Sequence, residues 1–575
     1  MVRAVLAPIA RLAWRALSRP GGWRGGALFG VILALELASI PITLRLIQWT
    51  ADFFDALETV DGDAAVHQLG VFGLITLASA ARFLAADYLR KRLLLSWRAA
   101  LTADALDCWL GTKAYWYLRP SFSAEGVDNP DQRIAEDCFL FVRGLLREAL
   151  DVIPSVVGLA SYIALLWSLS TFPLAFTLAG VAVEIPRYMV WAALLYVALS
   201  SLITHLLGRP LKDLYFRQER READLRYALT SVRDAAGEIA LSGGEPAERR
   251  RIDARFDALA ANWKRLIGRE FVLGTFVRPY FQTVLRIPLF LALPAYLAGS
   301  VTLGGVMQLA SAFSNVTTTL SWFIFSYRDL ADLVATAQRL DGLFQIAGAP
   351  PPLADLPHSV DRRGPVGKVL RVRGLRLVTP GGEALAPVPD FDLAPGDRVW
   401  LHGPSGVGKS TLLCALAGLW PYGAGTVTLP EGRLAFLPQR AYVPALGLVA
   451  AAAYPDDPAV HPARRIDDAL QAVGLAHLAR APALQAASGA APSADMASVG
   501  LSGGERQRLA LARLLIARPD WVFLDEATSA LDAEAERTLL DALDTALPHA
   551  AIVFVAHRRP TLAAPCRQIR LGPPL

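Results

Sequence analysis

A glycine-rich segment of nine residues, GPSGVGKST at 403–411, constrains the fold of this chain more than any other part of its sequence. It fits the pattern G-x-x-x-x-G-K-[ST] and lies between RVWL, typical of a short buried strand, and a stretch with the apolar spacing of a helix. Such a turn lets backbone N–H groups close on a phosphate at the positive end of the helix dipole. We therefore expect Lys409 to reach the β- and γ-phosphates of a nucleotide and the Ser410 hydroxyl to ligate Mg²⁺. The nucleotide-binding residues predicted in this loop are Gly403, Pro404, Ser405, Gly406, Val407, Gly408, Lys409, Ser410 and Thr411.

An acidic pair and a second glycine-rich segment accompany that loop. WVFLDE at 521–526 is an apolar strand that ends in two carboxylates; we expect Asp525 to hold Mg²⁺ through its water shell and Glu526 to act as general base on the attacking water. An Asp-Glu pair also commonly caps a following helix, but the apolar residues before it favour the catalytic role. LSGGERQR at 501–508 opens a predicted helix whose N-terminus presents polar groups to a phosphate. These groups belong to Ser502, Gly503, Gly504 and Glu505.

The order of these motifs resembles that of the ATP-binding cassette (ABC) ATPases, over residues 369–575. The resemblance implies that Gln439 links Mg²⁺ to a membrane domain, that Ser529–Asp532 forms the D-loop, and that His557 contacts the γ-phosphate as a catalytic switch histidine. It also implies a dimer, because in that family the signature segment of one subunit completes the ATP site of the other. The aromatic residue that usually stacks on adenine would fall near Thr379, where this chain has none.

The composition indicates that the rest of the chain lies in a membrane. Hydrophobic residues make up 54% of the sequence and charged residues 19%, whereas soluble domains typically carry about 25% charged residues. The net charge of +5 is modest and lies in loops expected to face the cytoplasm, which argues against a nucleic-acid partner. The four cysteines lack paired spacing, so we expect neither a disulfide framework nor a zinc site.

Six apolar stretches follow an N-terminus with five arginines and no acid, which predicts an amphipathic segment on the inner membrane surface. Each stretch is near the roughly 20 residues that a bilayer requires. The first loop carries only acidic charges, and the second and fourth connections are long, helix-like and basic. The positive-inside rule therefore places both termini in the cytoplasm. The expected spans are at about 27–48, 68–90, 149–170, 187–207, 271–299 and 302–326.

The segment EGVDNPDQRIAEDC at 125–138 predicts a turn at Asn129, with Asp131 as a candidate helix cap. Together with DFFDAL at 52–57 and GEIA at 237–240, it resembles an ABC branch that comprises the D-subfamily half-transporters and the bacterial SbmA/BacA-like permeases. The resemblance implies six spans per subunit in an exporter-type fold. It also implies substrates that range from acyl-CoA esters to peptides, bleomycin-like molecules and cobalamin.

The pentapeptide LSGGE occurs twice. The first copy, at 241–245, lies in the fourth connection, far along the chain from the phosphate loop and the acidic strand. We interpret it as a cytoplasmic helix segment with a glycine bend, and its likeness to the second copy as coincidence.

Several polar residues fall within the expected spans. Glu36 lies in the first, and Arg278 and Arg286 lie in the fifth. In the sixth, Gln308 and Asn315 belong to a polar stripe at helical spacing that also includes Ser311 and Thr319. Intramembrane charge usually faces a bundle interior or a wet cavity, so these residues are candidates for a substrate cavity. The alternative is interhelical hydrogen bonding that only holds the bundle together.

These observations predict a six-span helical membrane domain at 1–345, a linker at 346–368 and an α/β P-loop cassette at 369–575. We expect a homodimeric, ATP-driven half-transporter in a bacterial inner membrane that moves a hydrophilic or amphipathic solute, such as a peptide or a cobalamin-like compound, inwards. The alternatives are an exporter or acyl-CoA or lipid transporter of the same fold, or a membrane-anchored regulatory ATPase.

Overall fold

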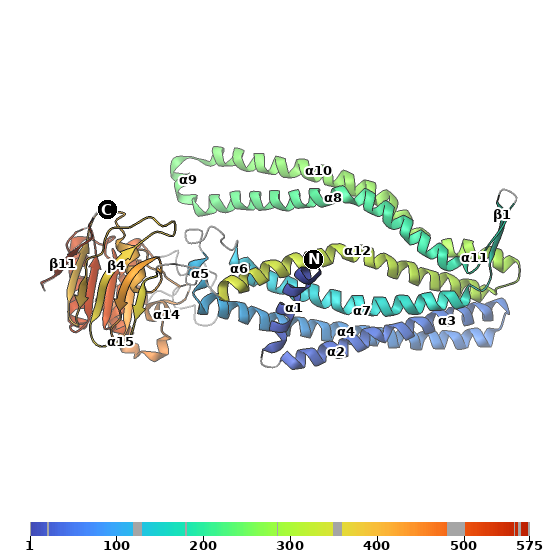
Figure 1. Ribbon diagram of the computed structural model, residues 1–575, viewed down its shortest axis with the longest axis horizontal. Coiled ribbons are helices and arrows are strands. Elements are labelled where there is room, and N and C mark those ends of the chain that lie inside the picture. Colours follow the sequence, from blue (N-terminus) through green and yellow to red (C-terminus); the bar gives the residue numbers. More distant parts are fainter. Residues whose placement is uncertain are drawn as a thin grey trace. The chain divides into compact units, whose positions relative to one another are not determined.

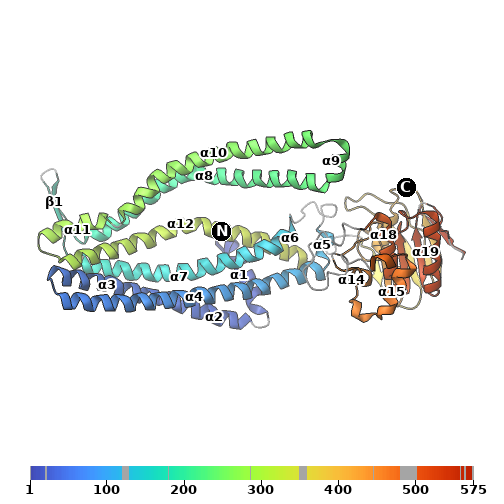
Figure 2. The same cartoon turned by 180° about the vertical axis from the view of Figure 1, so that it is seen from behind.

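The computed structural model describes most of the chain in two compact units. The first comprises Met1–Cys108 and Asn129–Gln345, and the second Trp109–Asp128 and Ile346–Leu575. Figures 1 and 2 show the long helices of the first and the sheets of the second from opposite sides. Of the expected linker, residues 349–358 lie outside the described ranges. Those ranges are 2–19, 22–118, 129–178, 181–284, 286–348, 359–444, 446–479, 501–556, 558–561 and 565–572.

Long helices make up most of the first unit (Figure 1). One of them has 50 residues, a length of about 75 Å against about 30 Å for the hydrocarbon core of a bilayer. Such a helix continues well beyond a membrane, as the long connections predicted. The elements are α1 (Val2–Ser18), α2 (Gly22–Leu37), α3 (Ser39–Glu58), α4 (Gly62–Gly111), α6 (Pro130–Gln132), the π turn η1 (Arg133–Asp137), α7 (Cys138–Leu169), β1 (Leu174–Leu178), β2 (Val181–Ile185), α8 (Tyr188–Asp234), α9 (Ala236–Ser242), α10 (Glu245–Thr283), α11 (Ile287–Leu297) and α12 (Leu303–Gly348).

Four helical segments of the described chain are long and apolar enough to cross a membrane: Gly22–Glu58, Gly62–Gly111, Pro130–Leu169 and Tyr188–Asp234. The fifth expected span, at 271–299, is divided between the end of α10 and the short apolar helix α11. Pro288 explains the division, because its ring clashes with the carbonyl four residues earlier and it offers no N–H to the helix. The sixth expected span lies in the first half of α12.

The helices of the first unit share an apolar core near the β1–β2 hairpin, at the end opposite α9 (Figure 2). Leu166 of α7, Met189 of α8 and Phe313 of α12 are all fully buried there. Ile47 of α3 and Ala292 of α11 complete the contact. Because five helices contribute, this core fixes the arrangement of the bundle at that end.

The start of α6, the helical turn that leads through η1 into α7, differs from the sequence prediction. Asn129 takes a left-handed conformation (φ 45°) as N-cap, and Pro130 is the first helical residue, where the missing N–H costs nothing. The prediction that Asp131 caps this helix was wrong: it lies within the first turn, and the N-cap has no side-chain hydrogen bond. Arg339 of α12 donates to both oxygens of Asp137 at 2.9 Å, which holds the segment on α12.

The second unit contains two β-sheets flanked by short helices. One sheet is parallel and five-stranded, in the order β11-β6-β10-β9-β8, and the other has the order β3-β7-β4-β5. The strands are β3 (Asp361–Arg363), β4 (Leu370–Leu377), β5 (Phe391–Leu393), β6 (Arg398–His402), β7 (Gly423–Thr428), β8 (Leu434–Leu437), β9 (Trp521–Asp525), β10 (Ala551–Val555) and β11 (Arg567–Arg570). The helices are α5 (Ala114–Tyr117), α13 (Lys409–Leu416), α14 (Leu448–Ala453), the 3₁₀ turn η3 (Pro458–Val460), α15 (Ala463–Ala472), α16 (Ala476–Ala479), α18 (Gly503–Ala517) and α19 (Ala533–Ala546).

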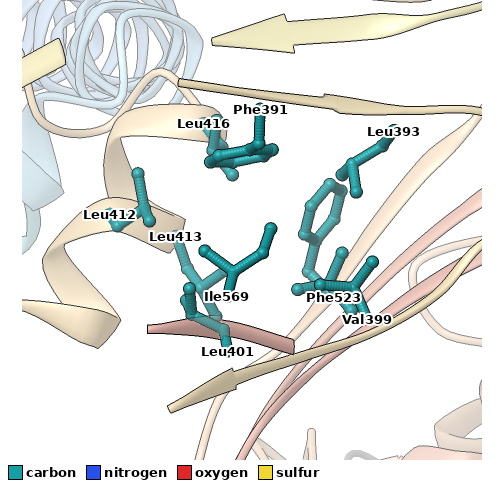
Figure 3. A pocket seen from close by; sticks show the side chains of 10 residues that line it. Phe391, Leu393, Val399, Leu401, Leu412, Leu413, Leu416, Phe523 and Ile569 are labelled. Carbon is teal, nitrogen blue, oxygen red and sulfur yellow. The ribbon is translucent and has the colours of Figure 1, made fainter. Parts of the chain in front are cut away.

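The five-stranded sheet is covered on both faces, and its strands alternate accordingly. Trp521 and Phe523 of β9 join the core that contains α13, while Val522 and Leu524 join the core that contains α18 and α19. Figure 3 shows the first core, where leucines of α13 face Phe391 and Phe523. The remaining cavity of about 10 Å³ barely holds one water, so this core anchors α13 and leaves no room for a ligand.

A short piece of the chain before α6 belongs to the second unit. In α5, the indole Nε1 of Trp116 donates to the Leu419 carbonyl at 2.8 Å, and the Tyr117 hydroxyl donates to the Gly418 carbonyl at 3.2 Å. Thr112 donates to the Ala347 carbonyl at 2.8 Å. The segment that follows α4 therefore packs on the loop after α13, at sequence separations of about 300 residues.

Candidate nucleotide-binding site

The predicted phosphate loop, acidic pair and glutamine meet at one edge of the five-stranded sheet. Parallel strands end at the same edge, and here Leu401 of β6 pairs with Val555 of β10, which pairs with Asp525 of β9. Leu437 of β8 pairs with Leu524 of β9. The residues that follow these strands are therefore neighbours because of the register of the sheet.

The phosphate loop occupies the turn between β6 and α13, as predicted. Gly406 and Gly408 have φ values of 79° and 100°, which residues with a Cβ rarely adopt. A Cβ on Gly403 would lie 2.9 Å from the carbonyl oxygen of Leu571. Lys409 is buried, and its Nζ donates to the carbonyls of Gly403 and Pro404 at 2.9 Å each. The ammonium group therefore lies over its own loop.

Asp525 and Ser410 lie side by side below this loop. The Ser410 hydroxyl is hydrogen-bonded to the Asp525 carboxylate. Burial raises the pKa of Asp525 above its ordinary value, and Glu526 adds to this, although the hydrogen bond from Ser410 and the charge of Lys409 oppose it. A hydroxyl and a carboxylate are oxygen ligands of the kind that Mg²⁺ prefers, so the pair fits that ion.

Gln439 and Glu526 are brought together two residues beyond the paired ends of β8 and β9. The Gln439 amide Nε2 donates to Glu526 Oε2 at 2.8 Å. Glu526 has a φ of 48° and its N–H donates to the Val555 carbonyl at 2.9 Å. Left-handed backbone at a residue other than glycine costs about 1 kcal/mol or more and is concentrated at functional sites. The strained backbone and the hydrogen bond to Gln439 therefore coincide at the residue predicted to be the general base.

The second LSGGE segment begins α18. Ser502 is the N-cap, and its hydroxyl accepts from the Glu505 N–H, while the Glu505 carboxylate accepts from the Ser502 N–H at 2.8 Å. The hydrogen bonds that the Ser502 N–H and hydroxyl donate to the Glu505 carboxylate lower the pKa of Glu505 below its ordinary value. Ser502 and Gly503 are exposed and Gly504 is half-buried, so the positive end of this helix is open to a ligand or partner.

Gln507 is a residue of this region that the sequence analysis missed. It is buried, its Nε2 donates to Ser529 Oγ at 3.2 Å, and its Oε1 accepts from the Ala530 N–H at 2.9 Å. Gln507 therefore fixes the expected D-loop to the signature helix. Asp532 ends that loop as the N-cap of α19. A glutamine five residues after a helix cap gives no signal by itself, because only burial distinguishes it from a surface residue.

The structure says less about two other predicted positions, the switch histidine His557 and the position Thr379, where an adenine-stacking aromatic would be expected. His557 lies outside the described residues, two residues beyond the end of β10. Thr379 forms a turn, with its N–H donating to the Glu383 carbonyl at 2.8 Å. A Cβ on Gly408 would lie 3.4 Å from the side chain of Leu385, so an aliphatic group lies near the phosphate loop in this part of the cassette.

The first LSGGE copy has a different structure from the second. Ser242 is the last residue of α9, and its hydroxyl donates to the carbonyls of Glu238 and Ile239. Gly243 follows with a φ of 63°, and α10 begins at Glu245. The predicted glycine bend is therefore confirmed.

Among the candidate cavity residues, Glu36 forms ion pairs between helices. Its carboxylate accepts from Arg82 at 2.9 Å and from Arg90 at 3.1 Å, both on α4. Arg90 also donates to Asp151 of α7 at 3.1 Å. Glu36 therefore makes the interhelical bonds that the sequence analysis named as the alternative to a role in a substrate cavity.

Among the described residues, no hydrogen bond joins the other candidate cavity residues to one another. Gln308 is buried and donates to Gln48 of α3 at 2.9 Å, whereas Asn315 donates to the Ser311 carbonyl of its own helix at 2.8 Å. Arg286 donates to the Gln282 carbonyl at 2.9 Å. Arg278 is exposed and makes no ion pair with the described residues. Their role in a substrate path stays a prediction.

Comparison with known proteins identifies the family. Residues 21–297 match the family model of the ABC transporter transmembrane region 2, and residues 388–529 match that of the ABC transporter. The chain is 32% identical, over 92% of its length and 91% of the relative's, to the inner membrane ABC transporter ATP-binding protein YddA of Escherichia coli (strain K12). The chain belongs to the ABC transporter family. Since membrane region and cassette share one chain, it is an ABC half-transporter whose cassette is an ATPase.

Two further proteins are similar to this ABC transporter. The ABC transporter D family member 2, chloroplastic, of Arabidopsis thaliana is 28% identical over 92% of this chain and 80% of that protein. A solved structure of a bacterial Atm1-family ABC exporter with ATP bound covers 96% of this chain and 94% of its own, with a TM-score of 0.72 and 18% identity. The predicted fold class, an exporter-type helical membrane domain with an α/β P-loop cassette, is confirmed.

Proposed function

We propose that this ABC half-transporter acts as a homodimer in a bacterial inner membrane and uses ATP hydrolysis to import a hydrophilic or amphipathic solute, such as a peptide or a cobalamin-like compound. The observation that carries the ATPase part is the sheet edge where the Ser410–Asp525 and Gln439–Glu526 pairs meet beside the phosphate loop. Binding, metal and base groups are needed within one site for phosphoryl transfer to water.

Each residue of this edge has a distinct task in the proposal. The backbone N–H groups of 403–411 and the Lys409 ammonium bind the phosphates. Ser410, Asp525 and Gln439 hold Mg²⁺, which when bound neutralises charge on the phosphate oxygens. Glu526 orients the attacking water and accepts its proton, because its carboxylate extends beyond the strand end and is positioned by Gln439. His557 contacts the γ-phosphate.

The homodimer is supported by the open end of α18. Ser502 and Gly503 are exposed, and in the described part of the chain no hydrogen bond joins residues 501–505 to 403–411. A second copy of the chain can supply the missing anion-binding helix end to each phosphate loop, in a symmetric pair.

Import of a hydrophilic solute rests on the resemblance to SbmA/BacA-like permeases and on the polar residues of the expected spans. Arg278 and Arg286 are exposed in the isolated chain, and charge at membrane depth usually faces a wet cavity. The solved exporter of the same fold makes export the second candidate.

The test uses cells that lack the gene. Deletion should make them resistant to a toxic peptide or to bleomycin, and wild-type protein should restore sensitivity. The Glu526→Gln variant should not, because removal of the base lowers turnover by about 100-fold or more while the phosphate cradle remains. Greater sensitivity after deletion, with the solute accumulating inside, would establish export instead.

A further inference from the structure

An open groove of about 520 Å³ runs between α8 and α10. Its lining includes four cationic side chains, one carboxylate and an apolar wall that contains Leu214 and Val272. The cations are Arg217 of α8 and Lys264, Arg265 and Arg269 of α10, and the carboxylate is Asp213. All five charged side chains are exposed, so the groove has a marked excess of positive charge.

These cations differ from three arginines near the other end of α10. Further along the hairpin, Arg249 pairs with Asp253 at 2.8 Å, Arg251 with Glu248 at 3.1 Å and Arg255 with Asp224 at 3.7 Å. In the groove, none of the four cations forms an ion pair or hydrogen bond with any residue that the structure describes, and neither does Asp213. The positive charge there is not neutralised within the chain.

The register of the hairpin places the groove at the edge of the expected membrane spans. Tyr196, within the span of α8, contacts Thr283 at the end of α10, and Asn262 of α10 donates to the carbonyl of Leu214 in α8. The expected span of α8 ends at about 207 and that of α10 begins at about 271, so the groove lies just beyond both. By the proposed topology this is the cytoplasmic side.

We propose that the groove binds the phosphate headgroup of an anionic phospholipid of the inner leaflet. Two or more guanidinium groups suit a phosphate, because each offers paired N–H donors. Basic pockets between helices on the cytoplasmic side recruit anionic headgroups. The apolar wall at Leu214 and Val272 favours a lipid, whose glycerol and first methylenes it can cover, over a free phosphorylated solute. The inference rests on the proposed topology and is independent of the substrate.

The test measures lipid retention by the full-length protein without ATP. Protein is extracted from nanodiscs of equal parts phosphatidylglycerol and phosphatidylcholine, and bound lipid is counted by native mass spectrometry. Wild type should retain phosphatidylglycerol selectively, and Arg265→Gln/Arg269→Gln should lose roughly tenfold or more of that selectivity. The matched control Arg249→Gln/Arg251→Gln removes the same charge from the same helix outside the groove and should behave as wild type.

Three results would overturn the proposal: unchanged selectivity in the groove variant, an equal loss in the control, or displacement of phosphatidylglycerol by glycerol phosphate at equal concentration, which would indicate a soluble ligand. Arg265→Lys/Arg269→Lys guards against misfolding, since it keeps the charge and should recover most of the selectivity. Because the readout needs neither ATP nor transport, failed import with retained lipid would contradict the proposed function alone.

Discussion

Asp525 is a residue of the predicted metal site whose burial lowers the stability of the metal-free protein at neutral pH. Burial raises the pKa of its carboxyl, so the folded protein holds this proton more tightly than the unfolded chain does. The residue then stabilises the fold below its unfolded pKa, and that contribution is lost as pH rises through its folded pKa. At neutral pH, well above its unfolded pKa, the desolvated carboxyl group therefore opposes folding until a cation joins it.

Asp525→Asn should accordingly raise the unfolding temperature of the metal-free protein at neutral pH, with the advantage over wild type shrinking as the pH falls. It should also abolish the stabilisation that Mg²⁺ adds in the presence of nucleotide. Calorimetry across the acidic range measures both, with the exposed Asp541→Asn on α19 as control. A variant less stable than wild type at neutral pH would show that the Ser410 hydrogen bond outweighs the cost of burial.

The two LSGGE copies provide a matched pair of serines. Ser502→Ala removes the hydroxyl that caps α18 and keeps the backbone arm of the capping box, which should cost about 1 kcal/mol of stability and lower ATP turnover. Ser242→Ala removes only hydrogen bonds to its own helical turn and should leave ATPase activity within about twofold. Phosphate release in detergent measures the activities. Equal losses in two folded variants would contradict the distinction.

At the scale of single residues the sequence predicted where the site residues lie better than what they contact. The phosphate loop, the carboxylates and Ser502 fall where their local patterns indicated, because each is defined within a few residues of a strand end or helix start. The positive φ of Glu526 and the burial of Gln507 could not be predicted, since both depend on neighbours supplied by other elements. Local patterns contain no information about those neighbours.

Among the elements, α1 holds two distant helices of the first unit together. Arg11 donates to both oxygens of Asp341 at 3.1 and 2.6 Å, Arg15 donates to Asp104 at 2.8 Å, and Leu12 is fully buried. The ring of Phe344 lies 4.5 Å below the Arg15 guanidinium. These contacts join α1 to the far ends of α4 and α12. The predicted contact of α1 with the membrane surface stays a prediction, and Trp14, 70% exposed, is the side chain best placed for it.

Arg11→Asp and Asp341→Arg should each lower the unfolding temperature, because each places like charges face to face. The double exchange should recover part of the loss, since it restores an opposite pair. A double-mutant cycle followed by thermal unfolding isolates this coupling from the rest of each substitution. If the double exchange lowered the unfolding temperature by as much as the two single exchanges together, the ion pair would contribute nothing to the position of α1.

The sequence indicated the elements more reliably than their continuity and their partners. The long apolar stretches predicted helices, yet the fifth is divided near Pro288 and the arginines of α1 are paired with acids up to 330 residues away. A periodic pattern shows which face of a helix is apolar. It does not show which helix will cover that face.

For the whole molecule, α5 is the element that matters most for how ATP could drive transport. The helix α4 runs to Gly111, and within a few residues the chain packs on the loop after α13, the helix that begins at Lys409. Within the second unit, the last residues of α4 are therefore joined through α5 to the loop that follows α13. This contact could not be predicted from the sequence, because its partners are separated by about 300 residues.

Trp116→Phe/Tyr117→Phe should separate hydrolysis from transport. The two substitutions keep an aromatic ring at each position but remove the indole donor to Leu419 and the hydroxyl donor to Gly418, each worth about 1 kcal/mol. We expect ATPase activity within about twofold of wild type and at least a tenfold loss of solute movement in vesicles. Trp109→Phe is the matched control, because its indole N–H has no acceptor in the described structure, so transport should persist. Parallel losses of hydrolysis and transport would instead mean that α5 supports the fold of the cassette rather than its coupling.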